Sequence, residues 1–258
     1  MKCWDRFDMK ISLCFTGNRD RVPPLDAELE RVGLKPDLRI WSVPDPSEAV
    51  LARVVRLDKF VRRAGYLNCT LNHYRAIRTA YDFGARTVLL LEDDIRFLKD
   101  LDALAETVDA APDAAVAMFD LVCDGAPSPT PAEIRAMLDE TARDRWAVPQ
   151  PHPCSMACVA LNCRGMTHFL ECFDGAFAGK WSLPIVDGFL HPAFRGRAKP
   201  PVECRVAWPL ACIQTPVAGS PSNTAKGFFN GDASCQLAWY KSIGVEPENY
   251  GGGDGALG

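Results

Sequence analysis

The chain has 258 residues, enough for one large α/β domain, and its formal net charge of -4 gives no basic surface for nucleic acid. Its apolar and charged fractions, 48% and 24%, are those of an ordinary folded protein. No stretch approaches the roughly 20 apolar residues that span a bilayer, and the polar start is unlike a signal peptide. We therefore expect a cytoplasmic protein without a transmembrane segment.

The 11 cysteines are scattered through the chain, and several lie in apolar runs, which is typical of reduced thiols in a cytosolic fold. Cys154, Cys158 and Cys163 are close enough in sequence to suggest a zinc site. They lack a Cys-x2-Cys pair, however, and they lie in an expected strand, where alternate side chains point to opposite faces. We therefore expect no structural zinc at these three residues.

The first part of the chain alternates strands with helices, which is the pattern of an α/β sheet. Strands are expected over 10–15 and 38–43, and helices over 23–32 and from Asp45 onward. A polar turn after the first strand carries two arginines.

Residues 68–83 have apolar side chains at three- and four-residue spacing, which predicts a helix with an inward stripe of Leu71, Tyr74, Ile77 and Tyr81. His73 lies beside that stripe. A lone histidine in a helix is more often packed or hydrogen-bonded than a ligand, so the spacing alone favours a structural role.

The later elements follow the same pattern. They are expected as helices over 100–110, 131–143 and 164–173 and as strands over 114–122 and 154–161. Residues after Gln214 are rich in glycine, serine and asparagine, and 251–255 are expected to be disordered. We treat 1–232 as a single domain and 233–258 as a carboxyl-terminal segment.

The most informative stretch is 87–95, where an uninterrupted apolar run leads into Glu92, Asp93 and Asp94. A run without alternation predicts a strand buried on both faces of a sheet. Three adjacent carboxylates must face water, a basic group or a cation, because burying an unpaired charge is too costly. Since open α/β folds bind ligands at the carboxyl ends of parallel strands, we predict the centre of an active site here. The alternative is that the acids begin an exposed loop or cap a helix.

Two further features carry chemistry. Arg19 and Arg21 follow the first strand, and their guanidinium groups suit either a phosphate or surface pairs with Asp20 or Glu28. Asp187 is a single acid inside an apolar sequence, which favours either a helix cap or a catalytic base.

The order and spacing of five motifs resemble glycosyltransferase family 25, which contains lipopolysaccharide and lipooligosaccharide galactosyltransferases. The resemblance runs from about Ile11 to Asn223. Its motifs are Leu13 to Arg21, Asn68-Cys69-Thr70-Leu71-Asn72-His73, Val88 to Asp94, Leu161 to Met166, and Pro184 to Leu190. Asn68 and Asn72 depart from the family, which usually has glycine and serine at those positions.

The resemblance implies a GT-A fold, a nucleotide-sugar-binding α/β fold with a mostly parallel central sheet flanked by helices. It also implies an inverting, metal-dependent hexosyltransferase that moves galactose from a UDP-sugar to a hydroxyl of an oligosaccharide or lipid-linked glycan. The expected process is lipopolysaccharide or surface-glycan synthesis. A lipid-linked acceptor would bring the protein to the inner membrane face as a peripheral protein.

The resemblance also implies roles for the acids. A divalent cation held by carboxylates neutralises the diphosphate leaving group, and oxygen ligands favour Mn²⁺ or Mg²⁺ over zinc. We expect Asp94 to bind the metal and Glu92 or Asp93 to bind its other side or the ribose hydroxyls. Glu92 and Asp94 share a face if the strand continues that far, and Asp93 then faces away.

Arg19, Arg21 and His73 complete the expected donor site. Asp187 is the expected catalytic base, which would deprotonate the acceptor hydroxyl. Its apolar surroundings should raise its pKa.

Two alternatives belong to other classes of protein. A phosphoacceptor receiver domain also holds Mg²⁺ with an acidic pair, but that pair follows the first strand of a chain about half this long. A catalytically degenerate sugar-nucleotide-binding protein is the second alternative, because Asn68 and Asn72 change the donor motif.

Overall fold

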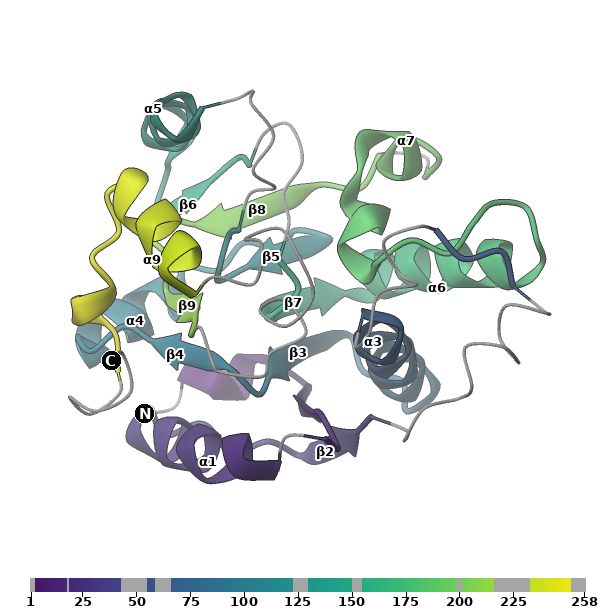
Figure 1. Ribbon diagram of the computed structural model, residues 1–258, viewed down its shortest axis with the longest axis horizontal. Coiled ribbons are helices and arrows are strands. Elements are labelled where there is room, and N and C mark those ends of the chain that lie inside the picture. The colour runs from purple at the N-terminus through teal and green to yellow at the C-terminus, as the bar shows by residue number, and fades with distance from the viewer. Residues whose placement is uncertain are drawn as a thin grey trace.

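The computed structural model describes residues 3–17, 19–42, 55–58, 66–122, 130–149, 155–198, 201–215 and 233–251. Strands and helices alternate around a seven-stranded sheet (Figure 1). The helix expected from Asp45 lies outside the described residues.

The strands of the main sheet are β1 (Met9–Cys14), β2 (Leu38–Trp41), β3 (Thr87–Glu92), β5 (Val116–Met118), β6 (Trp146–Ala147), β7 (Cys158–Asn162) and β8 (Cys204–Ala207). Their order in the sheet is β2-β1-β3-β7-β5-β8-β6. β1 pairs in parallel with β2 and β3, and β5 pairs in parallel with β8, whereas β6 and β7 are antiparallel to their neighbours. Five of the seven strands therefore run in one direction, which confirms the expected α/β fold class with a mostly parallel central sheet.

A second, two-stranded sheet begins directly after the acidic triplet. It consists of β4 (Ile95–Phe97) and β9 (Cys212–Gln214), which pair antiparallel. The triplet therefore lies where the chain passes from one sheet into the other.

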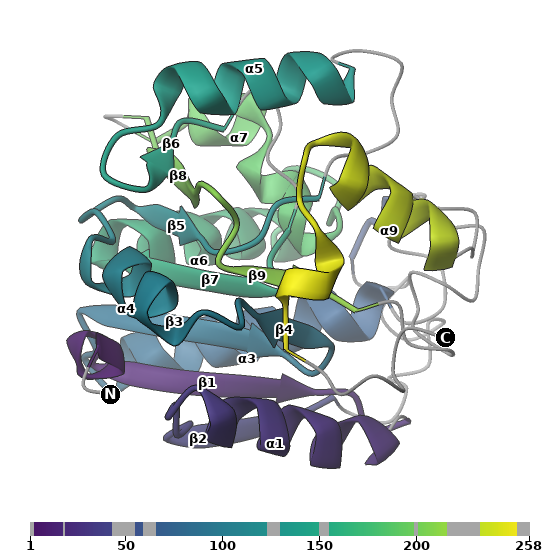
Figure 2. The ribbon, with the colours of Figure 1, turned by 90° about the vertical axis from the view of Figure 1, so that its left-hand side faces the viewer.

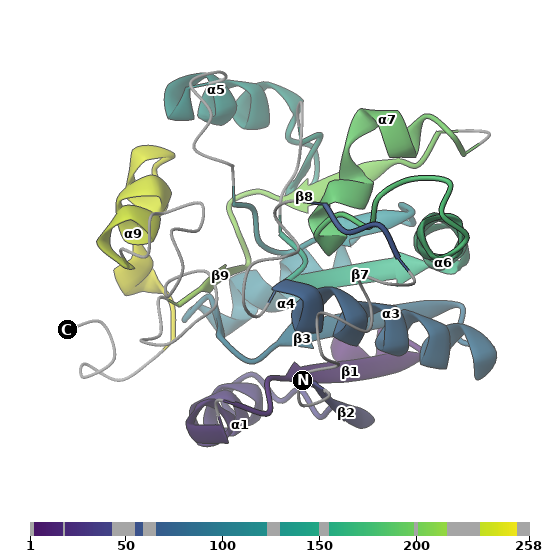
Figure 3. The same ribbon diagram turned by 45° about the vertical axis from the view of Figure 1, so that its right-hand side comes forward.

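Helices cover both faces of the main sheet. α3 (Tyr66–Asp82) and α6 (Cys163–Phe177) pack against each other on one face, and α4 (Leu101–Asp109) covers the other (Figures 2 and 3). The remaining elements are η1 (Cys3–Arg6), η2 (Arg19–Arg21), α1 (Val22–Arg31), α5 (Pro131–Thr141), η3 (Val186–Leu190), α7 (Pro192–Arg195), α9 (Ala233–Ser242) and η4 (Pro247–Asn249).

β3 is buried on both faces, as the unbroken apolar run predicts. Val88 and Leu90 join the core beneath α3 and α6, and Leu89 and Leu91 join the core beneath α4. All four side chains are 0% exposed. Because this strand is deeply packed, the backbone position from which the acidic side chains at its end extend is fixed.

The inward stripe expected for α3 is partly wrong. Tyr81 is 45% exposed, and the buried face of the helix instead contains Thr70, His73, Ala76, Ile77 and Ala80. Two alanines on this face have little side-chain bulk, so the helix packs closely on the sheet and on α6 while aromatic Tyr81 stays outside. His73 therefore lies within the buried face rather than beside it.

The helix starts follow the expected capping chemistry. Thr130 and Glu133 form a reciprocal capping box on α5, and the Asp100 side chain caps α4. At the start of α6, Gly165 sits so close to the sheet that an added Cβ would lie 1.9 Å from the Ala115 carbonyl oxygen. Only glycine allows this approach of helix to strand.

The carboxyl-terminal part is more ordered than its composition predicts. α9 was not expected, yet its Tyr240 is 0% exposed and belongs to the same core as α3 and α6. Residues 252–255, for which disorder is expected, lie outside the described residues.

The eight cysteines whose side chains the structure describes form no disulfide with one another. Cys158 is buried and Cys163 is exposed, while Cys154 lies outside the described residues. Among the described helices, none has the length and apolar character required to cross a membrane.

Candidate functional site

The acidic triplet occupies the turn between β3 and β4. β3 ends at Glu92, and Asp93 and Asp94 form the turn, so the strand does not continue to Asp94 as the shared-face expectation required. Because the backbone turns at this point, the three carboxylates reach different partners.

Asp93 is held by groups at the carboxyl end of β1. Its Oδ1 accepts a 2.8 Å hydrogen bond from Arg21 Nη1, and its Oδ2 accepts one of 2.8 Å from the Phe15 amide. The Arg21 and Asp93 side chains are each 5% exposed. Both oxygens of Asp93 therefore tie β3 to the segment that follows β1.

Asp94 is buried and incompletely paired. Its Oδ2 lies 3.5 Å from Arg21 Nη1, and its Oδ1 has no hydrogen-bond partner among the described residues. Nε and Nη2 of Arg21 are likewise buried and have no partner within the described part of the chain. Burial raises the pKa of Asp94 to about 7, and Glu92 and Asp93 add to the rise while Arg21 opposes it. Buried polar atoms of opposite charge with unused hydrogen-bonding capacity make this point a candidate ligand-binding position.

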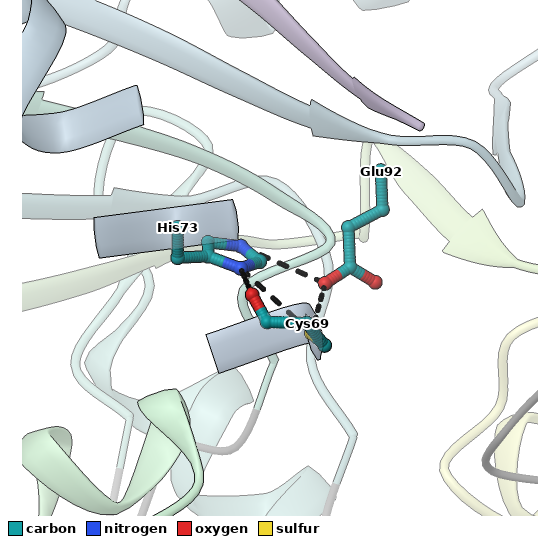
Figure 4. A group of neighbouring side chains, drawn as sticks. All are labelled: Cys69, His73 and Glu92. Atoms are coloured by element: carbon teal, nitrogen blue, oxygen red, sulfur yellow. Dashed lines mark hydrogen bonds and ion pairs between the residues drawn. The ribbon is translucent and has the colours of Figure 1, made fainter. Parts of the chain in front are cut away.

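Glu92 points the other way, toward α3 and β9 (Figure 4). Its Oε1 accepts a hydrogen bond from Cys69 Sγ at 3.3 Å and lies 3.6 Å from His73 Nε2. Its Oε2 accepts a 3.1 Å hydrogen bond from the Gln214 side-chain amide. Burial raises the pKa of Glu92 to about 7, and Asp187 is the next largest cause.

His73 is 1% exposed and faces backbone oxygens with both ring nitrogens. Nδ1 lies 3.0 Å from the Cys69 carbonyl oxygen and Nε2 lies 3.1 Å from the Met156 carbonyl oxygen. Burial lowers the pKa of His73, whereas the two carbonyls and Asp187 act to raise it. These contacts fit the hydrogen-bonded, structural role that its spacing favours, and the donor-binding role that the resemblance implies stays a prediction.

Asp187 is brought to the same place by η3. The amide of Val186 donates a 3.2 Å hydrogen bond to Thr70 Oγ1 on α3, which sets η3 against the helix that carries His73. Asp187 raises the pKa of Glu92, and burial raises the pKa of Asp187 itself to about 6. The rise expected from apolar surroundings is therefore present. An acid with this pKa is ionised at neutral pH and remains basic enough to accept a proton.

Arg19 does not join the acids. It is exposed, and its guanidinium lies 5.7 Å from the centroid of the Trp41 ring. In the part of the chain that the structure describes, no ion pair connects Arg19 with the triplet, so of the two arginines only Arg21 is part of the cluster.

A hydrogen-bond chain behind Glu92 was not expected from the sequence. The backbone amide of Gln214 donates to Tyr240 Oη at 3.0 Å, and Tyr240 donates in turn to Asp120 Oδ1 at 3.0 Å. Asp120 Oδ2 accepts from Ser155 at 3.1 Å. Asp120 could have been suspected, because it too follows a buried strand. Nothing in the sequence indicates a role in the site for Gln214 or Tyr240, because only the fold brings β9 and α9 to this point.

The candidate site therefore consists of two groups of side chains. Arg21 and Asp94 offer a buried cation and a buried anion with unused hydrogen-bonding capacity. Glu92, His73 and Asp187 form a group of titratable side chains on the α3 side. The first group can bind an anion through Arg21 and a cation through Asp94. The second group can exchange a proton close to them.

No family model matches the chain, and no curated protein sequence matches it. Among solved structures, a glycosyltransferase involved in the glycosylation of the major capsid of PBCV-1 is 10% identical, with a TM-score of 0.41 over 83% of this chain and 96% of that one. The apo-form glycosyltransferase GlyE of Streptococcus pneumoniae TIGR4 is 10% identical, with a TM-score of 0.43 over 92% of this chain and 60% of that one. Mannose-1-phosphate geranyltransferase from Thermus thermophilus is 15% identical, with a TM-score of 0.39 over 77% of this chain and 73% of that one. Likenesses at these scores assign no activity to this chain.

Proposed function

We propose that this protein is a glycosyltransferase that moves a sugar from a nucleoside-diphosphate donor to an acceptor hydroxyl. The observation that carries the proposal is the juxtaposition of Arg21 and Asp94, whose buried polar atoms lack partners. A diphosphate bound to a divalent cation offers the anion and the cation that these two side chains require.

Asp94 is the proposed metal ligand, and its unpaired Oδ1 is the oxygen that would bind the ion. A bound Mn²⁺ or Mg²⁺ would neutralise the charge that develops on the leaving diphosphate. Ions of this kind are often held by one or two carboxylates together with substrate phosphates. Glu92 stays the candidate for a second carboxylate, although Oε2 would have to give up its hydrogen bond with Gln214. Asp93 is the weaker candidate, because both of its oxygens already accept hydrogen bonds.

Arg21 is the proposed diphosphate ligand. Its Nη1 holds Asp93, which leaves Nε and Nη2 to donate to phosphate oxygens. His73 and Glu92 are proposed to line the donor site from the α3 side. Arg19 is proposed to contact the donor only at the exposed margin of the site, where its guanidinium lies over the Trp41 ring.

Asp187 is the proposed base of an inverting displacement. It would remove the proton from the acceptor hydroxyl while that oxygen attacks the anomeric carbon, on the face opposite the leaving diphosphate. The pKa of about 6 supports this role, since the carboxylate is ionised at neutral pH. Asp187 also interacts electrostatically with His73 and Glu92.

The finer parts of the proposal rest on the motif resemblance. They are UDP-galactose as donor, a glycan or lipid-linked glycan as acceptor, lipopolysaccharide or surface-glycan synthesis as the process, and peripheral contact with the inner membrane face. Family 25 membership is part of the same proposal.

A panel of nucleotide sugars in thermal-shift assays, each with and without Mn²⁺, tests the proposal. We expect one donor to raise the midpoint of unfolding only when Mn²⁺ is present, because a ligand that binds only the folded state stabilises it by mass action. The Asp94→Asn variant should lose this shift. If a donor binds but its sugar is neither transferred nor hydrolysed, the degenerate binding protein is correct; if no donor binds, the proposed function is wrong.

A further inference from the structure

Three side chains with different donor atoms meet between α3 and the end of β3. Cys69 and His73 are four residues apart on α3, and Glu92 faces both of them from the strand end (Figure 4). One ligand atom of each residue lies within 4.8 Å of the other two. Residues four apart on a helix project from the same face, so the backbone itself sets the spacing of the sulfur and the ring.

Both nitrogens of the His73 ring face backbone carbonyl oxygens, and Cys69 Sγ lies 3.8 Å from Nδ1. The two nitrogens lie 3.0 and 3.1 Å from the carbonyl oxygens of Cys69 and Met156, and a carbonyl can only accept. A neutral imidazole has one N–H and can donate to only one of them. If Nδ1 donates to Cys69, as the second nitrogen of a metal-bound histidine usually does, the Nε2 lone pair faces oxygen atoms. A nitrogen lone pair and an oxygen atom repel each other at this distance, and a cation between them removes the repulsion.

The distances suit a tetrahedral ion. Glu92 Oε1 lies 3.3 Å from Cys69 Sγ and 3.6 Å from His73 Nε2. Zinc bonds of about 2.0–2.3 Å at tetrahedral angles separate neighbouring ligand atoms by roughly 3.3–3.6 Å. These two separations therefore suit an ion that Glu92 shares with Cys69 and with His73.

We propose that Cys69, His73 and Glu92 form a binding site for Zn²⁺ or another soft divalent cation. The Met156 carbonyl, or a water molecule, would supply the fourth ligand. Binding replaces the hydrogen of the Cys69 thiol by the ion and releases one proton to solvent. Thiolate and imidazole ligands select zinc over Mn²⁺ and Mg²⁺, so this site differs in kind from the oxygen site at Asp94.

The zinc site does not depend on the proposed sugar transfer. It uses Glu92, however, and an ion held there would keep that carboxylate on the α3 side. Asp94 would then hold the donor's cation without Glu92.

The chain contains a second cysteine–histidine pair for comparison. His168 and Cys172 on α6 are also four residues apart, in the reverse order, with Cys172 Sγ 3.9 Å from both ring nitrogens. Within the described ranges, no carboxylate completes this second pair as Glu92 completes the first. The exposed thiol of Cys163 provides a control for non-specific metal binding.

The test is titration of the reduced full-length protein with Co²⁺ as a spectroscopic probe, followed by competition with Zn²⁺. We expect one equivalent of Co²⁺ to give a thiolate-to-cobalt charge-transfer band with tetrahedral ligand-field intensity, and Zn²⁺ to remove it. Cys69→Ser should abolish the band, and Glu92→Gln should weaken binding at least tenfold. Cys163→Ser, Cys172→Ala and Asp94→Asn should all keep it. The Asp94→Asn result separates this site from the donor metal.

A wild-type protein without a thiolate band would overturn the proposal, and so would a band that survives in Cys69→Ser but vanishes in Cys163→Ser. If Cys69→Ser fails to fold, as judged by circular dichroism, Glu92→Gln and His73→Gln decide the matter. Unchanged Co²⁺ affinity in both of these variants would mean that the three side chains form only a hydrogen-bonded cluster.

Discussion

The amide of Val186 donates a 3.2 Å hydrogen bond to the hydroxyl of Thr70, and this contact joins residues 116 positions apart in the sequence. Thr70 follows Cys69 on α3, and Val186 precedes Asp187 in η3. The bond therefore links the segment that carries the candidate base directly to the helix that faces the acidic triplet.

Replacing Thr70 by valine keeps its shape and removes the acceptor for Val186. We expect Thr70→Val to lower the free energy of unfolding by about 1–3 kcal/mol, because it leaves a buried N–H without a partner. Urea denaturation measures this loss. Thr70→Ser retains the hydroxyl and should recover the larger part of the stability; if serine is no better than valine, the hydrogen bond is not what holds η3.

Asp187→Asn should remove the base and leave the donor site intact. We expect sugar transfer to fall by about 10²–10⁴-fold, which is the usual contribution of a general base, while Mn²⁺-dependent donor binding changes little. Initial rates and calorimetry measure the two effects. In the wild type, transfer should decline as pH falls below about 6, because a protonated Asp187 cannot accept a proton.

For Asp94→Asn, in contrast to Asp187→Asn, we expect Mn²⁺-dependent donor binding itself to be lost. Retention of transfer within about tenfold of wild type in Asp187→Asn, a barrier change of about 1.4 kcal/mol, would mean that another group is the base.

The buried ion pair between Arg21 and Asp93 should contribute far more to stability than surface pairs do. Arg21→Met leaves the Asp93 charge buried without its partner, and we expect a loss of about 3–5 kcal/mol. Arg39, which pairs with Asp26 near the surface, provides the comparison, and Arg39→Met should cost no more than about 1 kcal/mol. Chemical denaturation of both variants checks the contrast. If both variants lost a similarly small free energy of unfolding, the Arg21–Asp93 ion pair would contribute no more to stability than a surface pair.

Asp120 predicts a pH dependence of stability. Burial raises its pKa from 3.8 to about 7, so between those values the folded protein holds a proton that the unfolded chain has released. Its contribution is therefore fully present below about pH 4 and is lost as pH rises through about 7, with a slope of at most about 1.4 kcal/mol per pH unit.

Asp120→Asn is neutral at every pH and can keep the hydrogen bonds with Tyr240 and Ser155. We expect its stability relative to wild type to rise from pH 5 to about pH 7 and then to level off, as followed by urea denaturation at each pH. Asp102→Asn, at an exposed position on α4, should show no such trend. A constant difference for Asp120→Asn would mean that Asp120 is ionised in the fold over the whole range.

Much of the fold follows from local chemistry in the sequence. The apolar run before Glu92 predicts a strand buried on both faces, and the structure confirms it because alternate residues contribute to the two cores. Capping at Thr130 and Asp100 depends on residues within one turn, so the helix starts are also predictable. Neither the two-residue β6 nor α9 has such a signal, because both are stabilised by partners distant in sequence.

The candidate site divides in the same way. The sequence by itself determined that three carboxylates must end a buried strand. It singled out Arg19, Arg21 and Asp187 by residue type and position, and His73 through the motif resemblance. Only the tertiary structure decided their partners, because the backbone turns after Glu92 and sends Asp93 and Asp94 to Arg21 while Glu92 meets Cys69 and His73. Which oxygen faces which cation depends on that turn and on the packing of α3, η3 and β9 around it, and these contacts join segments far apart in the chain.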